Sequence, residues 1–262
     1  MGHVRLGILP KTRAWKEVIR LIVDGADAAS VADATMRATD KAFETIQGDK
    51  GFSEVVDVLT QLAIAARSDD SREHLESLGI RLSPQSSLAE LAIVMNRILD
   101  RRAAANGKRS DFGELAQGAL VSAVTKHLQN RFGDLFSPSS QEIHSALSEL
   151  GKKSEFGQLS RTFFSELTFS SMDYFLSKHL GTEIGEDRRF ATTNQIGQFR
   201  DALRLHCEEA AEIVERYSGD WFSKNFFKDS GKISAKKIDG FGWYGMQKMR
   251  DEMNMRANNN GT

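Results

Sequence analysis

The chain has 262 residues, of which 40% are hydrophobic and 27% are charged, and its formal net charge is −1. This length suits one large domain or two small ones, and a chain of this size buries enough surface to need no disulfide or metal for stability. The near-neutral charge excludes an overall basic field that would attract nucleic acid or anionic lipid, so any such binding has to come from a local patch.

Cysteine content and hydropathy exclude further classes of protein. Cys207 is the one cysteine of the sequence, which rules out an intramolecular disulfide and a cysteine-based zinc site within the chain. The apolar stretch within residues 1–10 is too short for a signal peptide, and no run approaches the roughly 18 apolar residues that a membrane span requires. We therefore expect a cytoplasmic protein with no membrane partner.

Apolar residues in the first half of the chain recur at helical spacing. A hydroxyl before the first such stretch, at Thr12, predicts a helix start, and Gly25 predicts its end. Ser87, followed three residues later by Glu90, matches a capping box. The helices predicted in this half begin at Thr12, at about Asp27, at Ser53, at about Asp70, at Ser87 and at Asp111.

The second half continues the helical pattern with more aromatic residues. Residues 154–180 predict one long helix, or two with a break near residues 168–171. A charged loop is expected after this stretch, and a helix that starts at Thr193 is expected to end at Tyr217 because Gly219 follows. The other segments expected here are a loop at 137–140, a short helix at 143–150, a last helix at about 234–256 and a frayed tail at 257–262.

These elements predict an all-α fold, a single domain of roughly ten helices spanning residues 1–262. Only three prolines occur, and no stretch has the alternation typical of a strand. Two packed helical subdomains that meet near residues 136–140 remain an alternative, because the N-terminal half is rich in alanine and the C-terminal half holds most of the aromatic residues.

No catalytic or metal-binding motif is recognisable in the sequence. His206 is next to Cys207, but adjacent residues on a helix point about 100° apart, so this histidine is poorly placed to activate the thiol. The six histidines are scattered and form no paired metal-ligand motif. We predict no cofactor, no metal site and no catalytic residue; an enzyme whose site is assembled from distant residues, with His206–Glu209 as the first place to look, stays an alternative.

The segment after Gly219 departs from an ordinary helical bundle. Four aromatic residues fall within seven positions, and residues 220–262 contain eight Lys or Arg against five Asp or Glu. Aromatic rings among cations can serve as a clasp within the core, as a protein interface or as a site for single-stranded nucleic acid. The candidate partner-binding residues are Trp221, Phe222, Phe226, Phe227, Trp243 and Tyr244, and the candidate nucleic-acid-binding residues are Lys224, Lys228, Lys232, Lys236 and Lys237.

The leading functional hypothesis from the sequence is a non-catalytic interaction protein, an accessory subunit of a larger intracellular assembly such as a bacterial defence system. It depends on the aromatic candidates contacting a protein partner. Nucleic-acid binding through the lysines of the same segment is the second hypothesis. Both depend on whether the aromatic rings after Gly219 remain accessible in the folded chain.

Overall fold

A computed structural model shows the fold of the protein. The residues it describes are 12–44, 46–83, 86–106, 109–133 and 138–260. They form α-helices joined by short connections, and within these ranges no β-strand forms; an isolated β-bridge joins Ile184 and Phe190. The predicted all-α fold is confirmed. Among the described helices, none combines the length and the apolar content needed to cross a membrane.

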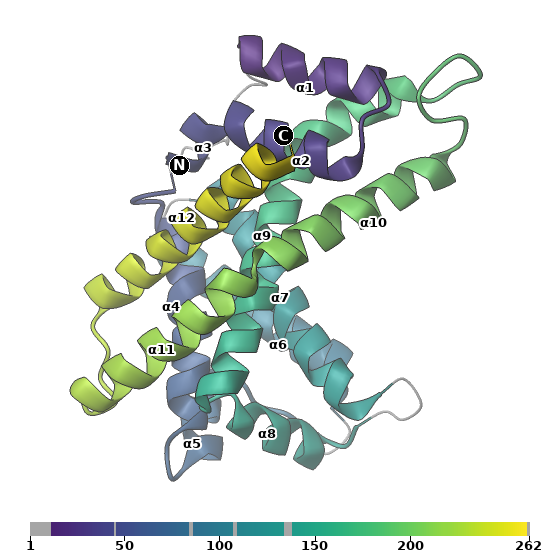
Figure 1. Ribbon diagram of the computed structural model, residues 1–262. Helices are drawn as coiled ribbons and strands as arrows, with labels where there is room; N and C mark the ends of the chain where they lie inside the picture. The colour runs from purple at the N-terminus through teal and green to yellow at the C-terminus, as the bar shows by residue number, and fades with distance from the viewer. Residues whose placement is uncertain (1–11, 45, 84–85, 107–108, 134–137, 261–262) are drawn as a thin grey trace.

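The helices follow one another with few long connections (Figure 1). The first eight are α1 (Arg13–Val23), α2 (Ala28–Ala38), α3 (Asp40–Glu44), α4 (Lys50–Ala66), α5 (Ser71–Ser77), α6 (Leu88–Asn106), α7 (Asp111–Phe132) and α8 (Ser140–Glu149). The remaining elements are α9 (Lys153–Leu180), the short 3-10 helix η1 (Gly181–Glu183), α10 (Thr193–Ala210), α11 (Glu212–Lys228) and α12 (Ala235–Asn260).

Most helix starts lie where the sequence predicts them, because polar side chains cap them. The Thr12 hydroxyl accepts a hydrogen bond from the Trp15 amide at 3.2 Å, and the Ser87 hydroxyl accepts one from the Glu90 amide at 3.3 Å. A reciprocal capping box that the sequence analysis did not predict joins Ser139 and Glu142 at the start of α8. The predicted loop at 137–140 falls partly outside the described residues.

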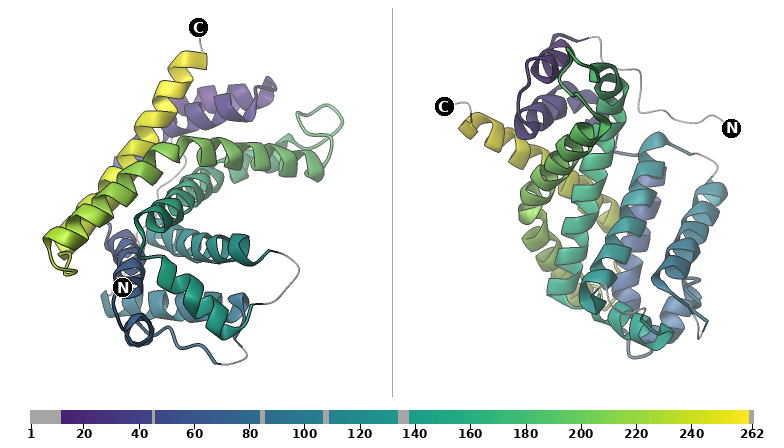
Figure 2. Two further views of the ribbon diagram at one scale, coloured as in Figure 1. Left: turned by 60° about the horizontal axis from the view of Figure 1, so that its bottom comes forward. Right: turned by 90° about the vertical axis from the view of Figure 1, so that its right-hand side faces the viewer.

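Helix α9 is the central element of the molecule. It is one continuous helix of 28 residues, which decides between the two arrangements that the sequence allowed. It contacts α7, α10, α11, α12 and α2, and most of its length is buried. Figure 2 shows helices from both halves of the chain packed around it. A subdomain boundary near residues 136–140 remains a prediction.

Two glycines allow α4 and α7 to cross closely. A Cβ atom on Gly113 would lie 2.8 Å from the Gly51 Cα atom, so neither position has room for a side chain. The helix starts are also linked, because the Ser110 hydroxyl accepts from the Gly113 amide and donates to Asp49, which caps α4. This junction fixes α4 against α7, the helix on which α9 packs.

Helix α11 continues through the position at which the sequence predicted a helix end. Gly219 does not stop the helix; it lies in the middle of α11, where a Cβ atom would be 2.7 Å from the Lys153 carbonyl oxygen. The glycine therefore serves close packing against the start of α9. The break occurs instead at Ala211, and the Arg161 guanidinium donates to the Glu208 carbonyl there at 3.2 Å.

Other predicted boundaries are also wrong. The helix expected to begin at Ser53 begins at Lys50, where the Asp49 carboxylate caps it. The helix expected from about Asp27 to Gln47 is divided at Thr39 into α2 and α3. The tail expected to fray from residue 257 is helical to Asn260, while residues 261–262 lie outside the described part.

Candidate functional site

Helices α11 and α12 form an antiparallel pair at one side of the molecule (Figures 1 and 2). The connecting turn contains two positive φ angles, 50° at Ser230 and 80° at Gly231, and the Gly231 amide donates to the Phe226 carbonyl at 2.9 Å. Across the turn, Lys237 Nζ contacts both carboxylate oxygens of Asp229 at 2.7 Å. These bonds hold the end of α11 next to the start of α12.

Buried phenylalanines attach the pair to α9. The ring centroids of Phe222 and Phe156 are 4.6 Å apart, and those of Phe241 and Phe156 are 5.7 Å apart. All three side chains are fully buried. The aromatic cluster therefore holds α11 and α12 firmly to the core.

Phe241 also supports two aromatic rings of α11. The Trp221 ring is stacked on it with centroids 4.3 Å apart and planes 21° apart, and Tyr217 is stacked on it at 5.8 Å and 20°. Tyr217 and Trp221 are half-buried. They are four residues apart on one helix, so they lie on the same face of α11.

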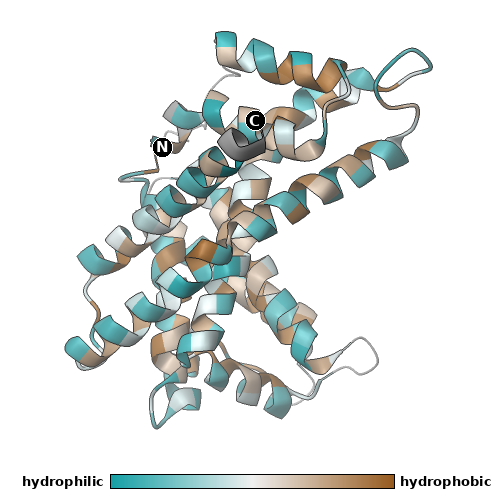
Figure 3. Cartoon of the chain, viewed as in Figure 1, coloured by the Kyte–Doolittle hydropathy of each residue, from teal (hydrophilic) through white to brown (hydrophobic). Residues whose placement is uncertain are grey.

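A groove of about 740 Å³ lies over these rings between α11 and α12. Its lining residues are Ile213, Arg216, Tyr217, Asp220, Trp221, Lys224, Asn225, Lys228, Lys237 and Lys248. Figure 3 shows that hydrophilic residues alternate with paler and apolar ones along both helices. The groove thus combines an aromatic floor with a cationic rim.

The charges of the groove are mostly positive. Five cationic side chains line it against one carboxylate, that of Asp220, which contacts Lys153 of α9 at 2.5 Å. Lys237 is engaged by Asp229. The cations that form no ion pair with another described residue are Arg216, Lys224, Lys228 and Lys248.

The protonation state of Tyr217 affects the charge of the groove. Burial, with a smaller contribution from the neighbouring Tyr244, raises the pKa of Tyr217 to about 12. Lys248 Nζ lies 5.3 Å from the centroid of the Tyr217 ring, as in a cation–π contact. At neutral pH Tyr217 is therefore uncharged and adds no negative charge to the groove.

The six aromatic candidates predicted from the sequence have different environments. Trp221 lines the groove, whereas Phe222 is fully buried and has no surface to offer a partner. Phe226 is half-buried with the Arg67 guanidinium 4.6 Å from its ring centroid, and Trp243 is half-buried against the core. Phe227 and Tyr244 are 88% and 58% exposed.

The five candidate lysines also divide into two groups. Lys224, Lys228 and Lys237 line the groove. Lys232 and Lys236 are exposed in the connecting turn and at the start of α12, outside the groove lining. The structure thus brings three of the five lysines together with Trp221.

Sequence reasoning missed the other groove residues, above all Arg216, Tyr217 and Lys248. The signal was present in the spacing of Tyr217, Trp221, Lys224 and Lys228, which repeats every three or four residues. Because the helix was expected to end before Gly219, Tyr217 was assigned to a helix and the three later residues to an irregular segment. Their common helix face was therefore not recognised. Lys248 is distant in sequence and joins the groove because α12 folds back along α11.

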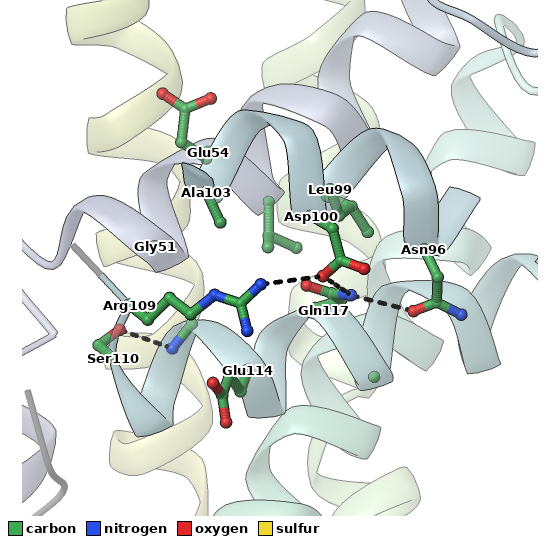
Figure 4. A pocket seen from close by; sticks show the side chains of 13 residues that line it. Gly51, Glu54, Asn96, Leu99, Asp100, Ala103, Arg109, Ser110, Glu114 and Gln117 are labelled. Atoms are coloured by element: carbon green, nitrogen blue, oxygen red, sulfur yellow. Dashed lines mark hydrogen bonds and ion pairs between the residues drawn. The ribbon is translucent and has the colours of Figure 1, made fainter. Parts of the chain in front are cut away.

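A second cavity, of about 370 Å³, lies between α4, α6 and α7 (Figure 4). Gln117 donates to Asn96 at 3.0 Å and to Asp100 at 3.2 Å, and Arg109 reaches to within 3.8 Å of Asp100. Figure 4 shows these side chains directed at one another across the cavity. Because its polar groups largely bond to one another, this cavity offers fewer free groups to a ligand than the α11–α12 groove does.

The histidine–cysteine pair is part of the core. His206 Nε2 lies 3.0 Å from Asp33 Oδ1 on α2, and both side chains are buried. Cys207 is fully buried, and burial raises the pKa of its thiol far above the ordinary value. Neither side chain is placed to reach a substrate at the surface.

Comparison of the chain with protein-family models, with curated proteins and with solved structures finds no match. Within the described residues, no three His, Cys, Asp or Glu side chains gather as a metal site requires. Functional inference therefore depends on the chemistry of the groove.

Proposed function

We propose that this chain is a non-catalytic binding protein and that the α11–α12 groove is its binding surface for an anionic macromolecule. The observation that carries the proposal is the gathering of Arg216, Lys224, Lys228 and Lys248 around one groove without ion-pair partners among the described residues. The cytoplasmic location expected from the sequence is part of this proposal.

The electrostatic argument is local. The whole chain has a net charge of −1, so long-range attraction of a polyanion is weak. Inside a concave site, however, unneutralised cations close to apolar rings raise the local concentration of anionic groups. The ligand is then selected by contact within the groove rather than by the overall field.

The burial and the pairing of the most reactive side chains support a non-catalytic role. The thiol of Cys207 is enclosed, and the His206 ring is engaged by Asp33. The groove itself presents cations, rings and the paired carboxylate of Asp220, which suit holding a ligand better than proton transfer.

Elution of the full chain from immobilised heparin tests this proposal, with heparin as a generic polyanion. The double variant Lys224→Glu/Lys228→Glu reverses two charges in the groove. The double variant Lys232→Glu/Lys236→Glu makes the same change in net charge at exposed positions outside it. We expect the groove variant to elute at clearly lower salt and the control variant to elute close to the wild type.

If both variants eluted at equally reduced salt concentrations, net charge alone would govern retention on heparin, and this would contradict the proposal. Failure of the wild-type chain to bind heparin at low salt would do the same. Far-UV circular dichroism of each variant ensures that the comparison is made between folded proteins.

A protein partner is the second candidate, and Phe227 favours it. This ring is 88% exposed at the end of α11, where a partner could bury it. The accessory-subunit hypothesis predicts that Phe227→Ser reduces the capture of a specific protein from native lysate, while Lys232→Glu does not. Identical capture by both variants would count against a partner at this position.

A further inference from the structure

Resting on the proposed function, we infer that the groove binds single-stranded nucleic acid, with bases stacked on Trp221 and Tyr217 and phosphates paired with Arg216, Lys224 and Lys228. The cationic residues alone would suit any polyanion. The arrangement of the rings favours a ligand that carries planar bases as well as phosphates, because it provides flat π surfaces among the cations.

The two rings are held in place before any ligand binds. Trp221 and Tyr217 are each within about 21° of the Phe241 plane, and Phe241 is itself fully buried among phenylalanines of α9. The rings therefore face similar directions and lose little freedom on binding. They are one helical turn apart, about 6 Å along the axis of α11.

The cations lie on either side of these rings along the helix. Arg216 precedes Tyr217, while Lys224 and Lys228 follow Trp221 by three and seven residues, so all lie on or beside the face that carries the rings. The stretch from Ile213 to Lys228 covers about 22 Å of helix. A strand that follows this face can place its phosphates near cations and its bases near rings.

Other polyanions use fewer of these features. In a duplex the base faces are stacked on one another, so the rings of the groove would have no partner. An acidic peptide would pair with the cations but offers few planar groups to match two aligned aromatic rings. Stacking is also tolerant of sequence, so we expect little preference among bases.

The decisive experiment compares two fluorescein-labelled strands that carry the same phosphates, the oligonucleotide dT12 and an abasic 12-mer. Binding of the full wild-type chain is followed by fluorescence anisotropy at several salt concentrations. We expect dT12 to bind at least about tenfold more tightly than the abasic strand, since stacking contributes about 1–3 kcal/mol per base. With three phosphate contacts, log K should fall with log salt with a slope of about −2 for both strands.

Two variants link the preference to the groove. Trp221→Leu keeps an apolar side chain against Phe241 but removes the stacking surface, so we expect loss of the preference for dT12 and unchanged binding of the abasic strand. Trp243→Leu is the control, because Trp243 is half-buried on α12 outside the groove lining. The comparison of the two strands uses the wild-type chain and so does not depend on the folding of any variant.

The outcomes separate this inference from the function on which it depends. Equal affinity for dT12 and the abasic strand, equal affinity for dT12 and a 12-base-pair duplex, or heparin binding with no binding of dT12 would each overturn single-stranded nucleic acid as the ligand while leaving polyanion binding intact. If the wild-type chain bound neither dT12 nor heparin, both the nucleic-acid inference and the proposed polyanion binding would be overturned. A strand of rU12 measured in parallel distinguishes RNA from DNA as the source of the bases.

Discussion

Glu166 of α9 joins three helices through a buried carboxylate. Lys126 of α7 contacts its Oε1 atom at 2.5 Å, and Arg204 of α10 contacts its Oε2 atom. Burial by itself would raise the pKa of Glu166, but the hydrogen bonds from Arg204 and Lys126 outweigh burial and hold the pKa below its ordinary value. The folded state therefore favours the ionised carboxylate.

Substitution Glu166→Gln is expected to lower the free energy of unfolding by about 2 kcal/mol at pH 7, because it weakens two charged hydrogen bonds in a buried place. Since the folded pKa lies below the unfolded pKa of about 4.3, this stabilisation is present above pH 4.3 and is lost as the pH falls through the folded value. Urea unfolding of wild type and variant at pH 7 and pH 3 measures the difference.

Glu17→Gln, which alters an exposed pair with Arg20, is the control and should leave the urea midpoint unchanged. A difference that persists undiminished at pH 3 would contradict the assignment.

Cys207 provides a second prediction at the scale of one side chain. Its sulfur is fully buried and its thiol pKa is raised by burial, so little thiolate forms and a reagent has no access. We expect no reaction with Ellman's reagent in native buffer at pH 8 and one equivalent of reaction in denaturant. Rapid labelling of the native chain would show that α10 is packed less tightly than described, and it would reopen the idea of a reactive cysteine.

The individual residues of the candidate site could be predicted only in part. Lys224, Lys228 and Trp221 were accessible to sequence reasoning because aromatic and basic residues are concentrated after Gly219. The burial of Phe222 and the exposure of Phe227 could not be predicted, since two phenylalanines five positions apart look equally apolar until the helix face is known. Buried partners such as Asp33 and His206 are 173 positions apart and leave no local signal.

At the scale of helices, the contact between α11 and α9 depends on Gly219. Substitution Gly219→Ala would place a Cβ atom 2.7 Å from a backbone oxygen of Lys153, which cannot move without shifting the start of α9. We expect destabilisation of about 1–3 kcal/mol in urea unfolding. Gly197→Ala is the matched control, since that glycine is exposed on α10 with nothing within 4 Å of the added atom, and the substitution should stabilise the protein by up to about 1 kcal/mol. Equal effects of the two substitutions would contradict the close contact.

Helix types and most helix starts were predictable, whereas some helix ends were not. Capping hydroxyls such as Thr12 act within one turn and can be read from the sequence. The break at Ala211 has no glycine or proline; a distant guanidinium, that of Arg161, bonds to the carbonyl group exposed there. A glycine can end a helix or allow it to pack closely against another helix. Gly219 does the latter because the start of α9 lies against it, and this contact cannot be read from the local sequence.

For the molecule as a whole, the buried apolar residues form one cluster that extends from Trp15 to Met253. Because α9 contacts helices from both halves of the chain, we expect urea unfolding to be a single cooperative transition. Tryptophan fluorescence, which reports on Trp15, Trp221 and Trp243, should coincide with far-UV circular dichroism. Two separated transitions would favour the alternative of two subdomains that meet near residues 136–140.

The position of α12 in the chain has a consequence for synthesis. This helix supplies Lys248 to the groove and the buried Phe241 beneath its rings, and it covers parts of α2 and α4. A ribosome makes α12 after the other eleven described helices, so a nascent chain that stops before residue 235 has neither the support for Trp221 nor the second wall of the groove. The proposed binding site is therefore complete only once α12 has been made, and we expect chains that lack α12 not to bind.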